Sequence, residues 1–149
     1  MLQLNIITTF VIDMNNTRFA TIIHILTLLA KNPDEWINSD WIASSINVNP
    51  VIVRKEMSVL QEQGWVISRK GKEGGSKLNI PSDQITLAEL YGTVKNSEVL
   101  GKKNLHPNPN CPIGKNINNK LETLFTETDE LVLTSLQAKT LKSFIDQFQ

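Results

Sequence analysis

The first clear pattern of hydrophobic and polar positions lies between residues 18 and 31. Its hydrophobic residues recur at intervals of three and four, which is the spacing of one face of an α-helix. These residues are Phe19, Ile22, Ile23, Leu26, Leu29 and Ala30. Asn32 and Pro33 end the pattern, because proline cannot continue a helix. We therefore predict a helix from about Arg18 that buries one broad face.

Capping residues indicate two further helices. The asparagine or the serine at 38–39 can be the N-cap of a short helix over 40–46. Asn49 can cap a third helix over 50–63, which has a proline in its first turn, where proline is favoured. Gly64 suits the left-handed position at which such a helix ends.

After the third helix the hydrophobic period shortens from 3.6 toward two. Residues 65–69 have the composition of a strand, and the glycine-rich segment 70–76 is typical of a turn. Residues 77–80 read as a return strand that Pro81 ends. A helix, a short helix, a capped helix and a glycine-tipped hairpin, in this order, predict a winged helix-turn-helix.

The remainder of the chain is again helical. A fourth helix is predicted over 86–94, a polar loop over 95–110 and a last helix over 137–148. Between the loop and the last helix, hydrophobic positions step by three and four, close to the spacing of a coiled-coil seam. The seam consists of Ile113, Ile117, Leu121, Leu124, Thr128 and Leu131. We expect its hydrophobic members to form a dimer interface.

These patterns divide the chain into four parts and predict a mainly α fold with a small β-hairpin wing. Residues 1–13 are an N-terminal extension of unclear role: they either pack on the rest or precede a functional chain that starts near Met14. Residues 14–81 form the winged helix-turn-helix, 82–110 a connecting helix and loop, and 111–149 the dimerisation helices.

Composition excludes several classes of protein. The 149 residues are 40% hydrophobic and contain one cysteine, so the chain is neither disordered nor a disulfide scaffold, and we expect a reduced, cytoplasmic setting. The segment 1–13 is too short to cross a bilayer, and we expect no membrane partner. Lys and Arg balance Asp and Glu at 15 each. However, residues 54–77 hold six basic and three acidic side chains, a local basic strip that could meet nucleic acid.

The third helix is the main candidate for DNA recognition. If Val53, Met57 and Leu60 face the core, the opposite face is free to enter a major groove, where Arg or Lys reads guanine and a valine methyl contacts thymine. A solvated face is the alternative. The candidate DNA-binding residues of this helix and its cap are Asn49, Pro50, Val51, Arg54, Lys55 and Ser58.

The hairpin is the second candidate element, because basic side chains flank its glycines and its tip can approach a phosphate. Its candidate residues are Arg69, Lys70, Lys72 and Lys77. The segment 71–75 does not match a nucleotide-binding P-loop, and a merely solvated hairpin is the alternative.

Several motifs together resemble one family. They are Arg18-Phe19-Ala20, His24-Ile25-Leu26, the run from Asn49 to Lys55, Ser68-Arg69-Lys70-Gly71 with Gly74-Gly75, Ile85-Thr86-Leu87, and the run from His106 to Gly114. In these motifs the chain resembles the Rrf2 family of bacterial winged-helix regulators, and the last run is most similar to its YwnA-like branch. The resemblance implies a homodimeric transcription factor, usually a repressor, that binds double-stranded DNA and pairs through its long C-terminal helix.

Two positions depart from the family pattern. Ser76 stands where the wing commonly carries an aromatic residue. Cluster-binding members resemble one another in three cysteines spaced six apart, but counting back from Cys111 gives Leu105 and Val99, which cannot ligate iron. We expect no iron–sulfur cluster and no other cofactor, although a site between subunits with other ligands stays open.

Cys111 is a candidate redox sensor. If Asn110 caps the helix that follows, the thiol lies beside free amides that favour the reactive thiolate. The alternative is a buried cysteine at the dimer interface. His24 is expected to be a packed histidine, and His106 with Cys111 would make only an incomplete metal site. No catalytic triad, metal motif or nucleotide fingerprint is visible, so we expect no enzyme.

The remaining functional alternative is a winged-helix module that binds another protein and not DNA. Arg54 and Lys55, near the capped start of the third helix, favour DNA.

Overall fold

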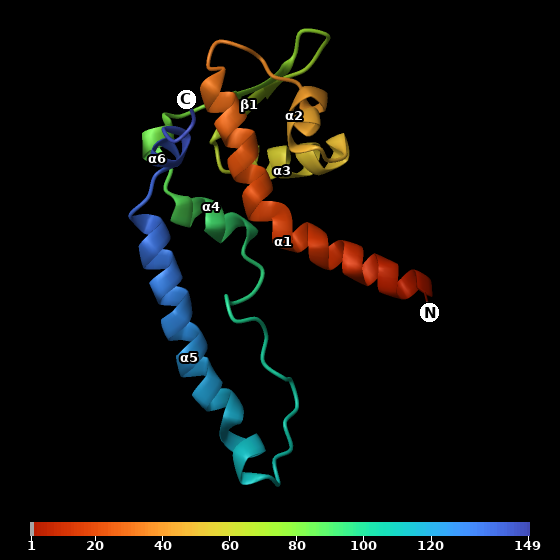
Figure 1. Cartoon of the computed structure of the whole chain (residues 1–149), viewed down its shortest axis with the longest axis vertical. Helices are drawn as coiled ribbons and strands as arrows, with labels where there is room; N and C mark the ends of the chain where they lie inside the picture. The colour runs from red at the N-terminus through yellow and green to blue at the C-terminus, as the bar shows by residue number, and fades with distance from the viewer. Residues whose placement is uncertain (1) are drawn as a thin grey trace.

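The structure, a computed structural model, describes the backbone of residues 2–149 and the side chains of residues 17–149. It combines helices with a two-stranded antiparallel hairpin, and the long helix over residues 112–137 leads away from the other helices (Figure 1). The elements are α1 (Leu2–Lys31), α2 (Ser39–Ile46), α3 (Pro50–Glu62), β1 (Val66–Arg69), β2 (Gly75–Leu78), the short 3-10 helix η1 (Ser82–Gln84), α4 (Leu87–Val94), α5 (Pro112–Gln137) and α6 (Leu141–Ile145). This order confirms the predicted fold class.

Helix α1 is longer than predicted. It begins at Leu2, so the expected start near Arg18 is wrong and the expected boundary at Met14 falls inside a continuous helix. The physical reason is local: no proline or glycine occurs between residues 2 and 31 to interrupt the hydrogen-bond ladder. The N-terminal part of α1 extends away from the other elements (Figure 1). The role of residues 1–13 depends on side chains outside the described residues.

The core is built around the second half of α1. The predicted apolar face is buried, and the other helices close over it. Side chains with essentially no exposed surface are Ile22, Ile25, Leu26, Leu29, Ile42, Val53, Leu60, Ile85, Leu90 and Leu141. Each such aliphatic side chain contributes about 1.5–3 kcal/mol by leaving water. Because the set spans α1 to α6, the hairpin and the C-terminal segment are held to one body.

An ion pair joins α1 to the back of α3. Arg18 donates from Nε and from its second terminal nitrogen to the two carboxylate oxygens of Glu56, at 2.7 and 2.9 Å. The Glu56 side chain is 3% exposed and the Arg18 side chain 20%. Glu56 raises the pKa of Arg18 through this hydrogen bond. The ion pair therefore holds α3 against α1.

Strands β1 and β2 form the wing, residues 66–78, with Val66 opposite Leu78 and Arg69 opposite Gly75. The return strand starts two residues earlier than the predicted 77–80. The reason is a third partner: Ile37 exchanges two backbone hydrogen bonds with Ser76, at 2.8 and 3.1 Å. Gly75 has φ +153°, and a Cβ there would lie 2.6 Å from the Ile37 carbonyl oxygen, so only glycine allows this close approach.

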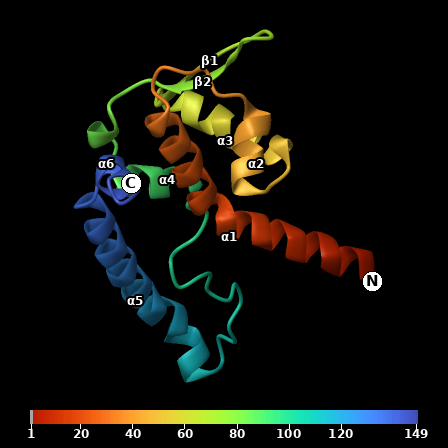
Figure 2. The ribbon, with the colours of Figure 1, turned by 45° about the horizontal axis from the view of Figure 1, so that its top comes forward.

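The connecting loop 95–110 lies along α5 (Figure 2). Asp129 holds its start: the carboxylate accepts from Lys95 Nζ at 2.5 Å and from the Val99 amide at 2.8 Å. The Lys95 hydrogen bond is the main reason why the pKa of Asp129 is lowered and that of Lys95 raised. Asp129 is therefore a structural anchor.

The C-terminal segment differs from the single helix predicted over 137–148. Helix α5 continues to Gln137, and the chain then becomes extended, with Thr140 bridged to Thr86. Thr140 caps the short helix α6 through a reciprocal pair of hydrogen bonds with Ser143. The cap and the bridge satisfy backbone groups that a continuous helix would have used within itself. A sequence period cannot show such a break.

Candidate nucleic-acid interface

Helix α3 has one buried face and one exposed face, as predicted. Val53, Met57 and Leu60 are buried, as predicted, so its other side is turned outward. On that side Val51 is 63% exposed, and Arg54, Lys55 and Ser58 are exposed. The Asn49 side chain accepts from the Val51 amide at 3.0 Å, which confirms the predicted N-cap, and Pro50 occupies the first turn. The start of α3 is therefore ordered and open to solvent.

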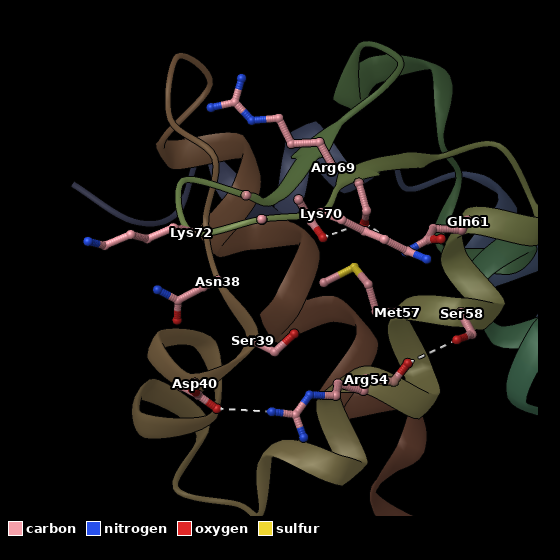
Figure 3. Close-up of a pocket in the computed structure, with 15 residues that line it drawn as sticks. Asn38, Ser39, Asp40, Arg54, Met57, Ser58, Gln61, Arg69, Lys70 and Lys72 are labelled. Carbon is pink, nitrogen blue, oxygen red and sulfur yellow. Dashed lines mark hydrogen bonds and ion pairs between the residues drawn. The ribbon is translucent and has the colours of Figure 1, made fainter.

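A cleft of about 490 Å³ separates the exposed side of α3 from the wing (Figure 3). We call it the wing groove. It is bordered by the start of α2, one side of α3 and both strands of the hairpin. Its lining includes Asn38, Ser39, Asp40, Arg54, Met57, Ser58, Gln61, Ser68, Arg69, Lys70, Lys72 and Ser76. Four of the lining residues are basic and one is acidic, so the groove attracts anions.

Arg54 is not a free cation. Its terminal nitrogen donates to Asp40 Oδ1 of α2 at 3.3 Å, and the two side chains are 57% and 76% exposed. An ion pair this exposed is worth about 0–1 kcal/mol, so a DNA base or phosphate can replace the carboxylate at little cost. Figure 3 shows Arg54 directed across the groove toward α2. Asp40 therefore orients the guanidinium without withdrawing it from solvent.

The base of the wing is tied to α3 by hydroxyl and amide groups. Gln61 Nε2 donates to Ser68 Oγ at 2.7 Å, and Ser68 and Ser76 share a hydrogen bond of 2.6 Å. Ser76 is buried, so the residue in place of an aromatic one serves as a link inside the hairpin. This series of hydrogen bonds holds the base of the wing next to α3.

The four basic candidates of the wing fall into two groups. Arg69 and Lys77 lie over the ring of Trp36, at 4.6 and 5.0 Å from its centroid, and Arg69 also donates twice to the Glu73 carbonyl. In Figure 3 the Arg69 side chain lies above the hairpin, away from α3. Lys70 and Lys72 are exposed at the tip. Arg54, Lys70 and Lys72 therefore line the groove from its two sides, whereas Arg69 and Lys77 are held over the Trp36 ring.

Several residues of the groove were missed from the sequence. Asn38 and Asp40 were considered only as the start of a helix, and Asn38 is indeed the N-cap of α2, accepting from the Trp41 amide at 2.8 Å. Gln61 and Ser68 carried no signal of their own. Their place at the groove depends on how α2 and the wing pack around α3, which no local pattern contains.

The chain resembles known proteins over most of its length. The model of the Rrf2 family, described as an iron-dependent transcriptional regulator, matches residues 15–147. The chain belongs to the Rrf2 family. Like other members of the Rrf2 family, it is a transcriptional regulator and not an enzyme.

Individual relatives agree with this assignment. YwnA of Bacillus subtilis, a proposed HTH-type transcriptional regulator, is 39% identical over 133 residues, which are 89% of this chain and 98% of YwnA. A proposed transcriptional regulator from Lactobacillus plantarum is 25% identical with a TM-score of 0.75, and 85% of each chain is covered. CymR of B. subtilis, the global cysteine regulator, shares the fold at 20% identity, with a TM-score of 0.66 over 89% of this chain and 96% of CymR.

The residues present do not fit the cluster that the family description suggests. The positions six and twelve before Cys111 hold Leu105 and Val99, which are 86% and 43% exposed and carry no donor atom. Within the described residues no three His, Cys, Asp or Glu side chains gather as a metal site requires. One thiolate per chain is too few ligands to hold such a cluster.

Cys111 itself is exposed in the single chain, so its burial at a dimer interface stays a prediction. It is the N-cap residue of α5, so the predicted cap by Asn110 is wrong. The reason is a turn just before it, in which the Asn110 amide donates to the Asn108 side chain at 2.9 Å. Hydrogen bonds from the backbone amides of Gly114 and Ile113 lower the pKa of the thiol. The expected environment is therefore present, although Cys111 and not its neighbour occupies the cap.

The predicted seam of α5 is uncovered in the single chain. Ile113, Leu124 and Leu131 are 71%, 50% and 73% exposed, whereas Ile117 and Leu121 are half-buried. Their exposure leaves a hydrophobic stripe on the long helix. A separate finding concerns membranes: among the described residues, none of the helices has the length and hydrophobicity needed to span one.

The secondary candidates have structural places. His24 is half-buried and shares a hydrogen bond with Ser45 of α2 at 3.1 Å. Of the three tryptophans, Trp65 is buried, Trp36 is half-buried and Trp41 is 47% exposed. His106 is exposed, like Cys111.

Proposed function

We propose that this transcriptional regulator is a sequence-specific repressor that binds a near-palindromic DNA operator as a homodimer. The observation that supports the proposal is the wing groove, an open cleft lined by Arg54 of α3 and by Lys70 and Lys72 of the wing. A recognition helix supplies base contacts, and a basic hairpin supplies phosphate contacts.

In this proposal α3 enters the major groove with its capped end first. Arg54 leaves the weak pair with Asp40 and donates to a guanine edge, while Val51 offers its methyl groups to thymine. Lys55 and Ser58 follow on the same exposed side. Lys70 and Lys72 neutralise phosphates, and each contact releases counterions, so affinity falls steeply with salt.

The homodimer follows from the stripe on α5. Ile113, Leu124 and Leu131 are exposed, and their near-heptad spacing suits a helix of a second subunit. A two-fold axis would place two copies of α3 on half-sites about one helical turn apart, roughly 34–36 Å.

The proposal also includes a response to oxidants through Cys111. Its thiolate attacks a peroxide: the sulfur is oxidised to sulfenic acid, and the peroxide is reduced to water after taking a proton. The sulfenic acid can then condense with a second thiol and release water. Because the chain has one cysteine, that thiol belongs to a second subunit or to a small molecule. Either product would change the start of α5, next to the connecting loop.

The test is fluorescence anisotropy with a duplex selected from a random pool, measured over a range of salt concentrations. Arg54→Ala should cost about 1–3 kcal/mol and relax preference at one base pair in each half-site. Lys72→Ala should weaken all sequences alike and reduce the salt slope by about one. Lys120→Ala, at an exposed position on α5, is the control and should bind normally. Absence of duplex binding would favour the protein-interaction module instead.

A further inference from the structure

A second cavity, unrelated to the wing groove, lies between α1 and the C-terminal segment. It measures about 780 Å³, within the range of small-molecule sites. Its walls are mainly hydrophobic: Phe19, Ile23 and Leu28 come from α1, and Phe144 and Phe148 from the C-terminal segment. The two phenylalanines of that segment meet edge to face, with ring centroids 5.5 Å apart. The cavity therefore has two aromatic rings in contact with each other on one side.

The polar residues that line this cavity are His24, Thr27, Lys31 and Gln149. Thr27 lines it, but its hydroxyl already donates to the Ile23 carbonyl at 2.7 Å. Lys31, in the last turn of α1, donates to the Phe148 carbonyl at 2.7 Å. One ammonium group has three donors, so two remain for another partner. Among the ion pairs of the described residues, none involves Lys31.

We infer that this cavity binds a small amphipathic carboxylic acid. The hydrophobic part of the ligand lies among Ile23, Phe144 and Phe148, and its carboxylate accepts hydrogen bonds from the two available donors of Lys31. An ammonium group beside a hydrophobic wall favours an anion with a hydrophobic body over a small hydrophilic anion or an uncharged hydrophobic molecule. The hydrophobic body leaves water, while the carboxylate keeps a charged hydrogen-bond partner.

The position of the cavity suggests what the ligand controls. His24 lines it and shares a hydrogen bond with Ser45 of α2, the helix that holds Asp40 at the wing groove. Phe144 belongs to α6, which follows α5 directly in the chain. A ligand that spans these walls contacts both the DNA-binding part and the dimerisation part, so it can favour one arrangement of the two. This last step rests on the proposed function, whereas binding itself does not.

The test is calorimetric titration of the full chain, without DNA, with decanoate and decanol below the concentrations at which they aggregate. Decanoate should bind at one site per chain, at least tenfold more tightly than decanol. Lys31→Met should remove this preference, and Lys139→Met, an exposed lysine of the C-terminal region, should not. Ala20 lines the cavity, so Ala20→Trp should weaken both ligands at least tenfold, whereas Ala138→Trp at an exposed site should not.

Two outcomes would overturn the inference: equal binding of decanoate and decanol, or unchanged decanoate binding in Ala20→Trp. A further result would also overturn it. If Ala20→Trp loses the dimer in sedimentation, the cavity is an interface between copies of the chain and not a ligand site. Lys31→Met removes an exposed side chain and its hydrogen bond to the Phe148 carbonyl but changes no core residue, so it keeps the test valid if the tryptophan variant fails to fold. Since no DNA is present, failure here leaves the proposed DNA binding to its own experiment.

Discussion

Removing Arg18 tests how the recognition helix is held in place. Arg18→Met keeps an unbranched side chain of similar reach but removes the guanidinium that binds both carboxylate oxygens of Glu56. The Glu56 side chain is 3% exposed, so its carboxyl group would be left without a partner and with little access to water. Because Glu56 belongs to α3, the loss of the ion pair destabilises the packing of the helix that lines the wing groove.

The expected cost follows from burial. Breaking a buried pair by removing one partner costs about 3–5 kcal/mol, because the remaining charge is left without compensation. Since a fifth of the Arg18 side chain is exposed, water can reach part of the site, and we expect the lower end, about 3 kcal/mol. With an m-value of about 2 kcal/mol/M, this lowers the urea midpoint by roughly 1.5 M.

The chain supplies a matched control for this experiment. Arg54→Met removes a cation from the exposed pair with Asp40, which should cost at most about 1 kcal/mol. Urea unfolding followed by far-ultraviolet circular dichroism, at one fixed protein concentration, compares the two variants. The double variant Arg18→Met/Glu56→Leu should recover much of the loss, because no buried charge remains. Equal midpoints for the two arginine variants would refute the argument from burial.

Three further predictions concern the C-terminal half. Leu124→Asp should give monomers in sedimentation, while Thr126→Asp, at an exposed position outside the seam, should stay dimeric; a monomeric wild type would contradict the proposed interface. Cys111 should react with iodoacetamide along a pH curve whose midpoint lies below the ordinary value of 9.0, and a midpoint at or above that value would show that the helix amides have no effect. Asp129 has a folded-state pKa below its ordinary 3.8, so its contribution to stability is present above about pH 4 and is lost as pH falls through the folded pKa. Asp129→Asn should therefore destabilise the protein at pH 7, and the difference from wild type should shrink below pH 4; a constant difference would mean that the charge is unimportant.

The parts that sequence predicted well are those decided by neighbouring residues. Asn49 caps α3 because its side chain reaches an amide two residues away, and Gly64, with φ +75°, follows the helix because glycine tolerates that geometry. The burial of Val53 follows from the helical period. These features need no knowledge of distant segments, so α3 and its exposed face could be named in advance.

The parts that sequence missed depend on contacts between distant segments. Ile37 extends the hairpin from 39 residues upstream of Ser76, and nothing near either residue announces the pairing. Asp40 meets Arg54 because α2 packs across α3. Asp129 lies 34 residues from Lys95 in the sequence, yet it anchors the connecting loop through that residue.

The tight fit of Gly75 against Ile37 divides the wing into a portion that mutation must spare and a portion that it can explore. A side chain at Gly75 would strike the Ile37 backbone, and one at Gly74 would lie 2.3 Å from the Arg69 carbonyl oxygen. Lys70 and Lys72, only a few residues away, are exposed at the tip. A library randomised at these two lysines should yield regulators of unchanged thermal stability and altered affinity for DNA. Separating the two properties in this way lets the strength of DNA binding diverge among descendants while the scaffold stays intact.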